Sequence, residues 1–432
     1  EPFEERKMFQ QFGLDRVSNM AKKSETLKPS YDRWTGSFEE VFRSMRKRHH
    51  DLKAHLIPNL FSGYLARLKV EAPMNEEWKW LYFLIGNIHG FRHFLMLKNY
   101  YGHNRRAFHE YYRHPFSYFI NEIKTLINKG TTHTVPLAFD EFLMKLQEDA
   151  RFLITEQSEL DHEQCELYML LWTKLFKKKT WRQAEREKVS RLLHDKNTIP
   201  LTVGAIHLNY LLNHDERAIQ LIQTIKERAV PYLFPLLEQL LQKNDWRRMG
   251  PYVEMFAAFI KPFLDRLAEP NSQSELTKMA VELIAPYASK SGKNDFFENF
   301  LIKTLPYSYP YYDQFLFANR LFEKWVDLQI LIGFPKAASI PEEQLSFIMK
   351  ENPKSLLPLY HYLVQEHIGA KSREHYREAV RKLRGLKEIY ETIGQTDEWN
   401  HFLHTLLERT KRLRAFHEEC KLGNVILQNE VR

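Results

Sequence analysis

Apolar residues recur along this chain with the spacing of α-helices. Between residues 218 and 225 they fall at positions i, i+3, i+4 and i+7, which places them on one helix face. Similar stripes lie at 233–241, 376–383 and 399–407. Strict apolar/polar alternation, the pattern of a half-buried strand, is hard to find anywhere. The pattern therefore predicts an all-α protein with no sheet of more than two short strands.

Short polar breaks separate the stripes. Asp245, Asp295 and Asp397 each precede an apolar run, where a carboxylate can accept from the first backbone N–H groups of a helix. The intervals between these breaks are uneven, whereas a tetratricopeptide array would repeat every ~34 residues. We therefore expect a degenerate helical-repeat solenoid, a right-handed stack of antiparallel helix pairs.

Linker-like composition divides the chain into three expected regions. The best linker candidates are residues 128–136 and 269–275, where Gly, Thr, Pro, Asn and Ser gather. We expect an N-terminal helical region at 1–135 with a cluster of histidine and aromatic residues. Central helical repeats should follow at 136–270, and C-terminal repeats at 271–432.

Composition excludes several classes of protein. Only 15 of 432 residues are glycine, and neither common Gly-rich nucleotide-binding motif occurs. Two cysteines cannot make a disulfide framework, so we expect a reducing, cytoplasmic location. No stretch is apolar enough to predict a membrane span. No ordering of Ser, Cys, His and Asp suggests a catalytic site, so we expect a protein that is not an enzyme.

Two basic runs are candidate contacts for phosphate groups. Lys and Arg exceed Asp and Glu by 63 to 55, which permits contact with nucleic acid without establishing it. Non-specific binding would use backbone-neutralising cations and, in the second run, a tryptophan for stacking. The alternative is that both runs are solvated helix ends. The candidates are Arg43, Arg46, Lys47 and Arg48, and then Lys177, Lys178, Lys179, Trp181 and Arg182.

His89 and His93 are weak candidates for a metal site. They lie four residues apart, so on a helix they would share a face and could supply two ligands to zinc. A third ligand would have to come from elsewhere in the chain. The alternative is that they are packing histidines in an aromatic-rich helix pair, and we expect no cofactor in this chain.

The last part of the chain, residues 355–420, carries a series of helical motifs. They begin with Ser355-Leu-Leu-Pro-Leu-Tyr360 and continue with Tyr376…Ala379-Val380…Leu383, Leu386-Lys387…Tyr390, Glu398-Trp399…Leu403 and Lys411-Arg412…Ala415. This part resembles the helical tail of bacterial SWIM zinc-finger proteins. Members of that family carry a preceding C-x-C…C-x-H module that binds one zinc. This chain lacks that pattern, so the resemblance implies a zinc only if such a module precedes Glu1.

The resemblance implies an accessory role in DNA or protein binding, sometimes beside Swi/Snf-type helicases. We therefore expect a non-enzymatic protein-interaction scaffold with a helicase-like protein partner, possible non-specific contact with nucleic acid and no contact with membranes. The alternative is a helical-repeat regulator that responds to a ligand or peptide.

Overall fold

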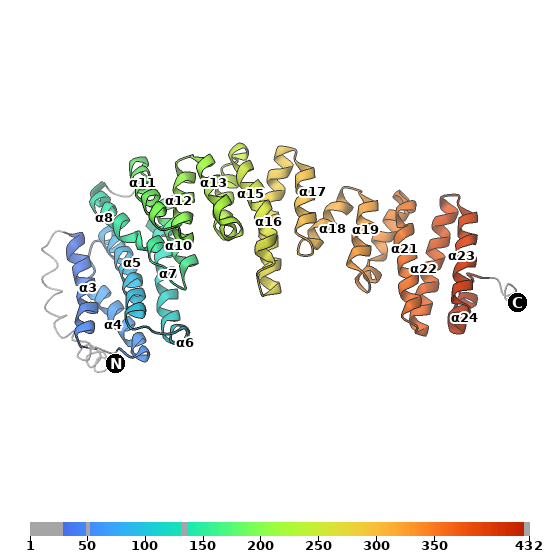
Figure 1. The fold of residues 1–432 in the computed structure, drawn as a ribbon, viewed down its shortest axis with the longest axis horizontal. Coiled ribbons are helices and arrows are strands. Elements are labelled where there is room, and N and C mark those ends of the chain that lie inside the picture. Colours follow the sequence, from blue (N-terminus) through green and yellow to red (C-terminus); the bar gives the residue numbers. More distant parts are fainter. Residues whose placement is uncertain (1–28, 49–51, 131–136, 427–432) are drawn as a thin grey trace. The chain divides into compact units, whose positions relative to one another are not determined.

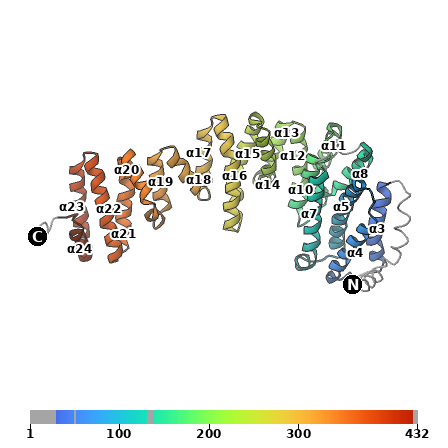
Figure 2. The ribbon, with the colours of Figure 1, turned by 180° about the vertical axis from the view of Figure 1, so that it is seen from behind.

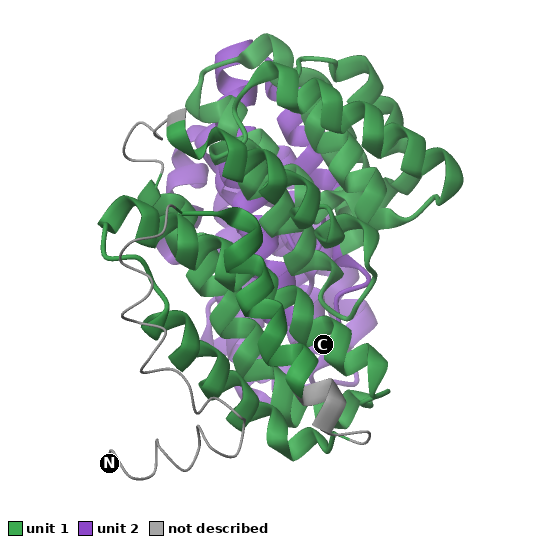
Figure 3. Cartoon of the chain, turned by 90° about the vertical axis from the view of Figure 1, so that its left-hand side faces the viewer, with its two compact units in different colours: residues 1–263 green, residues 264–432 purple. Residues whose placement is uncertain are grey.

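A computed structural model describes residues 29–48, 52–130 and 137–426, without the side chains of 45–48 and 137. All regular structure in these ranges is helical, which confirms the all-α prediction (Figure 1). None of these helices is long and apolar enough to cross a membrane. The chain forms two compact units, Glu1–Phe263 and Leu264–Arg432 (Figure 3).

Unit 1 is built from helices of very different length. Short 3-10 segments and one π-helical turn, Phe108–Tyr112, join some of them. The α-helices are α3 (Tyr31–Arg48), α4 (Ile57–Val70), α5 (Glu76–Tyr100), α6 (Arg105–Ala107), α7 (Arg113–Gly130), α8 (Asp140–Ala150), α9 (Phe152–Thr155), α10 (Asp161–Lys174), α11 (Lys179–Asp195), α12 (Ile199–Leu211), α13 (Asp215–Ile225), α14 (Val230–Gln242) and α15 (Trp246–Leu264).

Aromatic side chains form the core around α5. Helix α3 packs on α5 and buries Trp34, Phe38 and Phe42. The Trp34 and Phe38 rings each lie 5.2 Å from Tyr82, in edge-to-face arrangements that aromatic pairs prefer. Gly90 lets the rings of α4 and α7 approach α5, since a Cβ there would lie only 2.6 Å from Tyr64.

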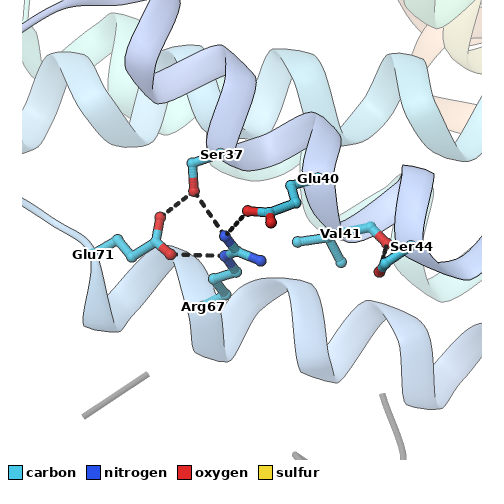
Figure 4. A network of polar contacts seen from close by, with 6 residues as sticks. All are labelled: Ser37, Glu40, Val41, Ser44, Arg67 and Glu71. Atoms are coloured by element: carbon cyan, nitrogen blue, oxygen red, sulfur yellow. Dashed lines mark hydrogen bonds and ion pairs between the residues drawn. The ribbon is translucent and has the colours of Figure 1, made fainter. Parts of the chain in front are cut away.

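A polar network also joins α3 to α4 (Figure 4). Arg67 donates from Nε to Glu71 at 2.7 Å, and from Nη2 to Glu40 at 3.0 Å and Ser37 at 3.2 Å. Ser37 in turn donates to Glu71. The Arg67 side chain is only 11% exposed, so little water reaches its charge. The carboxylates of Glu40 and Glu71 compensate that charge in place of water.

Helices α11, α12 and α13 pack on their neighbours in the chain, whereas α10 packs on α7, α9 and α12. Helix α12 contacts α10, α11 and α13, and Figures 1 and 2 show α11, α12 and α13 side by side. Helix α12 is buried over most of its length, as its almost wholly apolar sequence requires. Helix α11, in contrast, buries only Glu185 and Val189 and exposes most of its charged side chains.

Unit 2 repeats the pattern of neighbouring helices packed in pairs. Helix α22 contacts α21, α23 and α24, and Gly385 gives the ring of Tyr360 room against α22. The helices are α16 (Pro270–Ser291), α17 (Asn294–Lys303), α18 (Tyr309–Ala318), α19 (Phe322–Ile332), α20 (Glu342–Glu351), α21 (Leu357–Gly369), α22 (Arg373–Thr392), α23 (Thr396–Thr410) and α24 (Arg414–Leu422).

The three predicted aspartate breaks lie at or next to helix starts. Asp245 precedes α15 and accepts from the backbone N–H of Arg248 at 3.3 Å, as a cap does. Asp295 and Asp397 lie inside the first turns of α17 and α23, where their charge still suits the helix dipole. The chain divides into two units at Phe263–Leu264, and the expected boundary at 135 falls outside the described residues, so the division into three regions stays a prediction.

Candidate functional site

The two candidate metal-binding histidines lie on the face of α5 that meets α3. The His93 ring stacks on Phe42 with centroids 4.4 Å apart, and its centroid is 6.2 Å from that of His89. Among the described residues, no group of three or more His, Cys, Asp and Glu side chains is placed to hold a metal ion. The structure therefore brings His89 and His93 together, but supplies no third ligand within the part that it describes.

His89 belongs instead to a cluster with Tyr31 and Asp149. Tyr31 donates from its hydroxyl to Asp149 Oδ2 at 2.5 Å, and His89 Nε2 lies 3.2 Å from the same oxygen. Burial and the neighbouring Asp149 carboxylate raise the pKa of Tyr31 well above its ordinary value, so the phenol keeps its proton. Burial alone would raise the pKa of Asp149, but the hydrogen bonds from His89 and Tyr31 outweigh it and lower that pKa.

This cluster forms one wall of a pocket of 570 Å³ between α3, α5 and α8. Arg43 of the first basic run and both histidines line this pocket, so the structure brings together residues from two separate predictions. The lining residues are Tyr31, Asp32, Thr35, Glu39, Arg43, His89, Arg92, His93, Met96, Lys145, Glu148 and Asp149.

The basic groups that line the pocket already have acidic partners. Arg43 pairs with Glu39 at 3.2 Å, and Lys145 pairs with Asp32 at 2.8 Å. Arg92 pairs with Glu156 at 3.0 Å. Because these pairs are partly exposed, each contributes little to stability, and their carboxylates compete with any bound phosphate.

A small apolar hollow of 60 Å³ adjoins the pocket and shares His93 and Met96 with it. Phe42, Leu97 and Tyr100 complete its lining. The Tyr100 side chain is 69% exposed and Met96 is 39% exposed, although most apolar residues of α5 are buried. We call the pocket and this hollow together the α3–α5 groove.

The rest of the first basic run lies at the end of α3. Arg46, Lys47 and Arg48 fall in the last turn of α3, but their side chains lie outside the described part. The prediction that they contact phosphate groups stays a prediction.

The second basic run spans the connection between α10 and α11. Lys177 and Lys179 are exposed. Lys178 forms an ion pair with Asp140, and its Nζ lies 4.6 Å above the Trp181 ring. A base could stack on that face of the ring only after displacing Lys178.

Arg182 has a structural role at the end of α10. Its Nη2 donates to the carbonyl of Trp172 at 2.9 Å, and its Nε donates to that of Phe176 at 3.1 Å. Burial lowers the pKa of Arg182. Arg182 thus satisfies carbonyl groups at the end of a helix. For this residue, the contacts agree with the alternative that the run is a helix end.

Sequence reasoning missed Tyr31 and Asp149, which complete the wall of the pocket. They lie 118 positions apart, and neither stands in a recognisable motif. Only the packing of α3 and α8 on α5 brings them together, so no local signal in the sequence could have found them.

Both cysteines are buried. Burial, the largest cause in each case, raises the pKa of the Cys165 and Cys420 thiols to about 12. Thiolate is the nucleophilic form, so neither side chain is suited to nucleophilic chemistry at neutral pH.

Comparisons with known proteins add one relative and one solved structure. No family model matches the chain. An uncharacterized protein of Bacillus subtilis (strain 168), YwqB, is 25% identical over 400 residues, covering 92% of this chain and 74% of its own length. A solved circular tandem repeat protein with novel repeat topology and enhanced subunit contact surfaces aligns with 90% of this chain and 92% of its own. Its identity is 13% and its TM-score 0.25.

Proposed function

We propose that this chain is a non-enzymatic protein-interaction scaffold, and that the α3–α5 groove binds a segment of another protein. The observation that supports this most directly is the exposure of Tyr100 and Met96 beside a hollow at the end of a buried helix. Tyrosine and methionine are enriched at protein interfaces, where an aromatic ring can supply much of the contact area.

The chemistry of the groove limits the partner. An apolar side chain fits the hollow between Phe42, Leu97 and Tyr100, whereas the larger pocket offers paired charges of both signs. An apolar centre with a polar rim is the usual arrangement of a protein interface. The partner segment should therefore present one apolar side chain flanked by polar residues.

The resemblance to SWIM zinc-finger proteins suggests which partners to test first. A helicase of the Swi/Snf type is the first candidate, with the scaffold as its accessory. Two buried thiols suit a cytoplasmic location, where such a partner would be met.

Site-specific crosslinking tests this proposal. A photoreactive phenylalanine at position 100 should capture a partner segment in the producing cells, while the same group at Leu331, which is 73% exposed in unit 2, should not. The purified partner should then bind the wild-type chain and lose affinity by roughly tenfold or more with Tyr100→Ser. Capture of chaperones alone, or equal affinity of Tyr100→Ser and wild type, would refute the proposal.

A further inference from the structure

A second pocket, of 360 Å³, lies between α11, α12 and α13 of unit 1. These helices lie side by side in Figures 1 and 2. The pocket shares no lining residue with the α3–α5 groove. It is lined by Arg186, Glu187, Ser190 and Arg191 of α11, Asn209 of α12 and Arg217 of α13. We call it the α11–α13 basic pocket.

Two of the three arginines of this pocket donate hydrogen bonds to groups other than carboxylates. Arg186 donates from Nη1 to Nδ1 of His214 at 2.5 Å, and Arg217 donates to the amide oxygen of Gln220 at 3.0 Å. Neither acceptor is a carboxylate. Within the described residues none of the three arginines forms an ion pair, and Glu187 is the one carboxylate that lines the pocket.

Two exposed arginines of helix α22 in unit 2 show a different arrangement. Arg373 pairs with Glu419 at 2.8 Å, and Arg381 pairs with Glu342. The side chains of those arginines are 56% and 55% exposed, and each has a carboxylate partner. The charges of Arg373 and Arg381 are therefore compensated by carboxylates, whereas the structure places no such partner against Arg186, Arg191 or Arg217 within the residues that it describes.

Both helices that carry the arginines are anchored on their buried sides. In α11, Glu185 receives two hydrogen bonds from Arg151, at 3.0 and 2.7 Å. At the start of α13, Asp215 accepts from Arg248 at 2.7 Å and from the Tyr252 hydroxyl at 2.6 Å. These contacts fix the helices, so a ligand does not need to order the backbone when it binds.

We infer that the α11–α13 basic pocket binds the carboxylates of an acidic segment of a partner protein. Guanidinium groups recognise carboxylates through paired N–H donors, and three arginines from two helices line this pocket. No aromatic residue lines the pocket, so it lacks the stacking surface that single-stranded nucleic acid uses. An Asp- or Glu-rich segment therefore fits the site better than nucleic acid.

Fluorescence anisotropy with the full chain tests this inference. The probe is a fluorescein-labelled decapeptide of alternating Glu and Gly, and the same peptide with Gln for Glu is the neutral control. Binding should be specific for the Glu peptide and weaken as salt is raised, because the contacts are charged and exposed. The triple variant Arg186→Gln, Arg191→Gln, Arg217→Gln should bind roughly tenfold more weakly.

Two matched variants separate a site from a general charge effect. Changing Lys177, Lys178 and Lys179 to Gln removes the same charge at the start of the same helix, and should alter affinity less than about twofold. Changing the three arginines to Lys keeps the charge but loses the paired donors, and should give an intermediate affinity. Far-UV circular dichroism and the melting temperature check that every variant is folded.

Three results would overturn the inference. The first is that the wild-type chain does not bind the Glu peptide. The second is that the arginine and lysine triple variants lose affinity equally. The third is that a single-stranded oligonucleotide displaces the peptide at a concentration of negative charges lower than that of the peptide itself. The variant Tyr100→Ser should bind the Glu peptide normally. Failure of the α3–α5 groove proposal would therefore leave this inference standing, and the reverse also holds.

Discussion

The ion pair between Arg151 and Glu185 is expected to hold α11 in place. Arg151 lies between α8 and α9, and its guanidinium makes two hydrogen bonds to a carboxylate that is only 3% exposed. The Tyr168 hydroxyl of α10 donates to the same carboxylate at 3.2 Å. Three helical segments therefore meet at one buried charge.

Replacement of Arg151 by Met leaves that charge without its cation. Removing one partner of a buried ion pair lowers the free energy of unfolding by about 3–5 kcal/mol. Because the Arg151 side chain is 19% exposed, we expect a somewhat smaller loss here, about 2–4 kcal/mol. The double variant Arg151→Met, Glu185→Leu removes the buried charge as well. It should regain most of that loss, which gives a coupling energy of about 2 kcal/mol or more.

Two measurements test this prediction. Urea unfolding followed by circular dichroism gives the change in unfolding free energy, and the first transition is the relevant one if the two units unfold separately. Hydrogen exchange followed by mass spectrometry should show faster exchange in peptides from α11 of the single variant than in those from unit 2. A cost below about 1 kcal/mol for Arg151→Met, or no recovery in the double variant, would refute the reasoning.

Three further predictions concern acid stability, packing and nucleic acid. Burial lowers the pKa of His207 to about 3 in the folded chain. As the pH falls, the imidazole is therefore protonated in the unfolded chain before it is protonated in the folded chain. The free energy of unfolding should fall by up to about 1.4 kcal/mol per pH unit as the pH drops from about 6.5 toward 3. The urea midpoint should fall with it, and His207→Gln should reduce this pH dependence. Gly90→Ala should destabilise by about 1–3 kcal/mol because its Cβ meets two aromatic rings, whereas Gly36→Ala, with open space around it, should stabilise by about 0.4–1 kcal/mol in thermal melts. Charge reversal of Lys177, Lys178 and Lys179 should weaken any DNA binding. The slope of log affinity against log salt concentration should become shallower by about one per lost phosphate contact. Unchanged affinity would identify this run as a solvated helix end.

The helical fold could be predicted from the sequence because each amphipathic helix carries its own local pattern. In α13 the stripe of Ala218, Leu221, Ile222 and Ile225 is buried at all four positions, as its spacing requires. In α22 the stripe from Tyr376 to Leu383 is buried in the same way. Such patterns repeat every few residues, so they need no knowledge of the rest of the chain.

The sites could be predicted only in part, because their partners are distant in sequence. The second basic run was visible as a cluster of cations, but the pairing of Lys178 with Asp140 joins residues 38 positions apart. The arginines of the basic pocket are scattered over α11 and α13, with no run to mark them. A count of charges cannot separate a cation that has a carboxylate partner from one that lacks it.

The burial of both native thiols makes this chain convenient for labelling. With the pKa of Cys165 and Cys420 raised to about 12, maleimide reagents should react with neither at neutral pH. A cysteine introduced on the surface would then carry a dye alone, without removal of the native residues. Probes placed in turn beside Tyr100 and beside Arg191 could report on the groove and the basic pocket separately within one intact molecule.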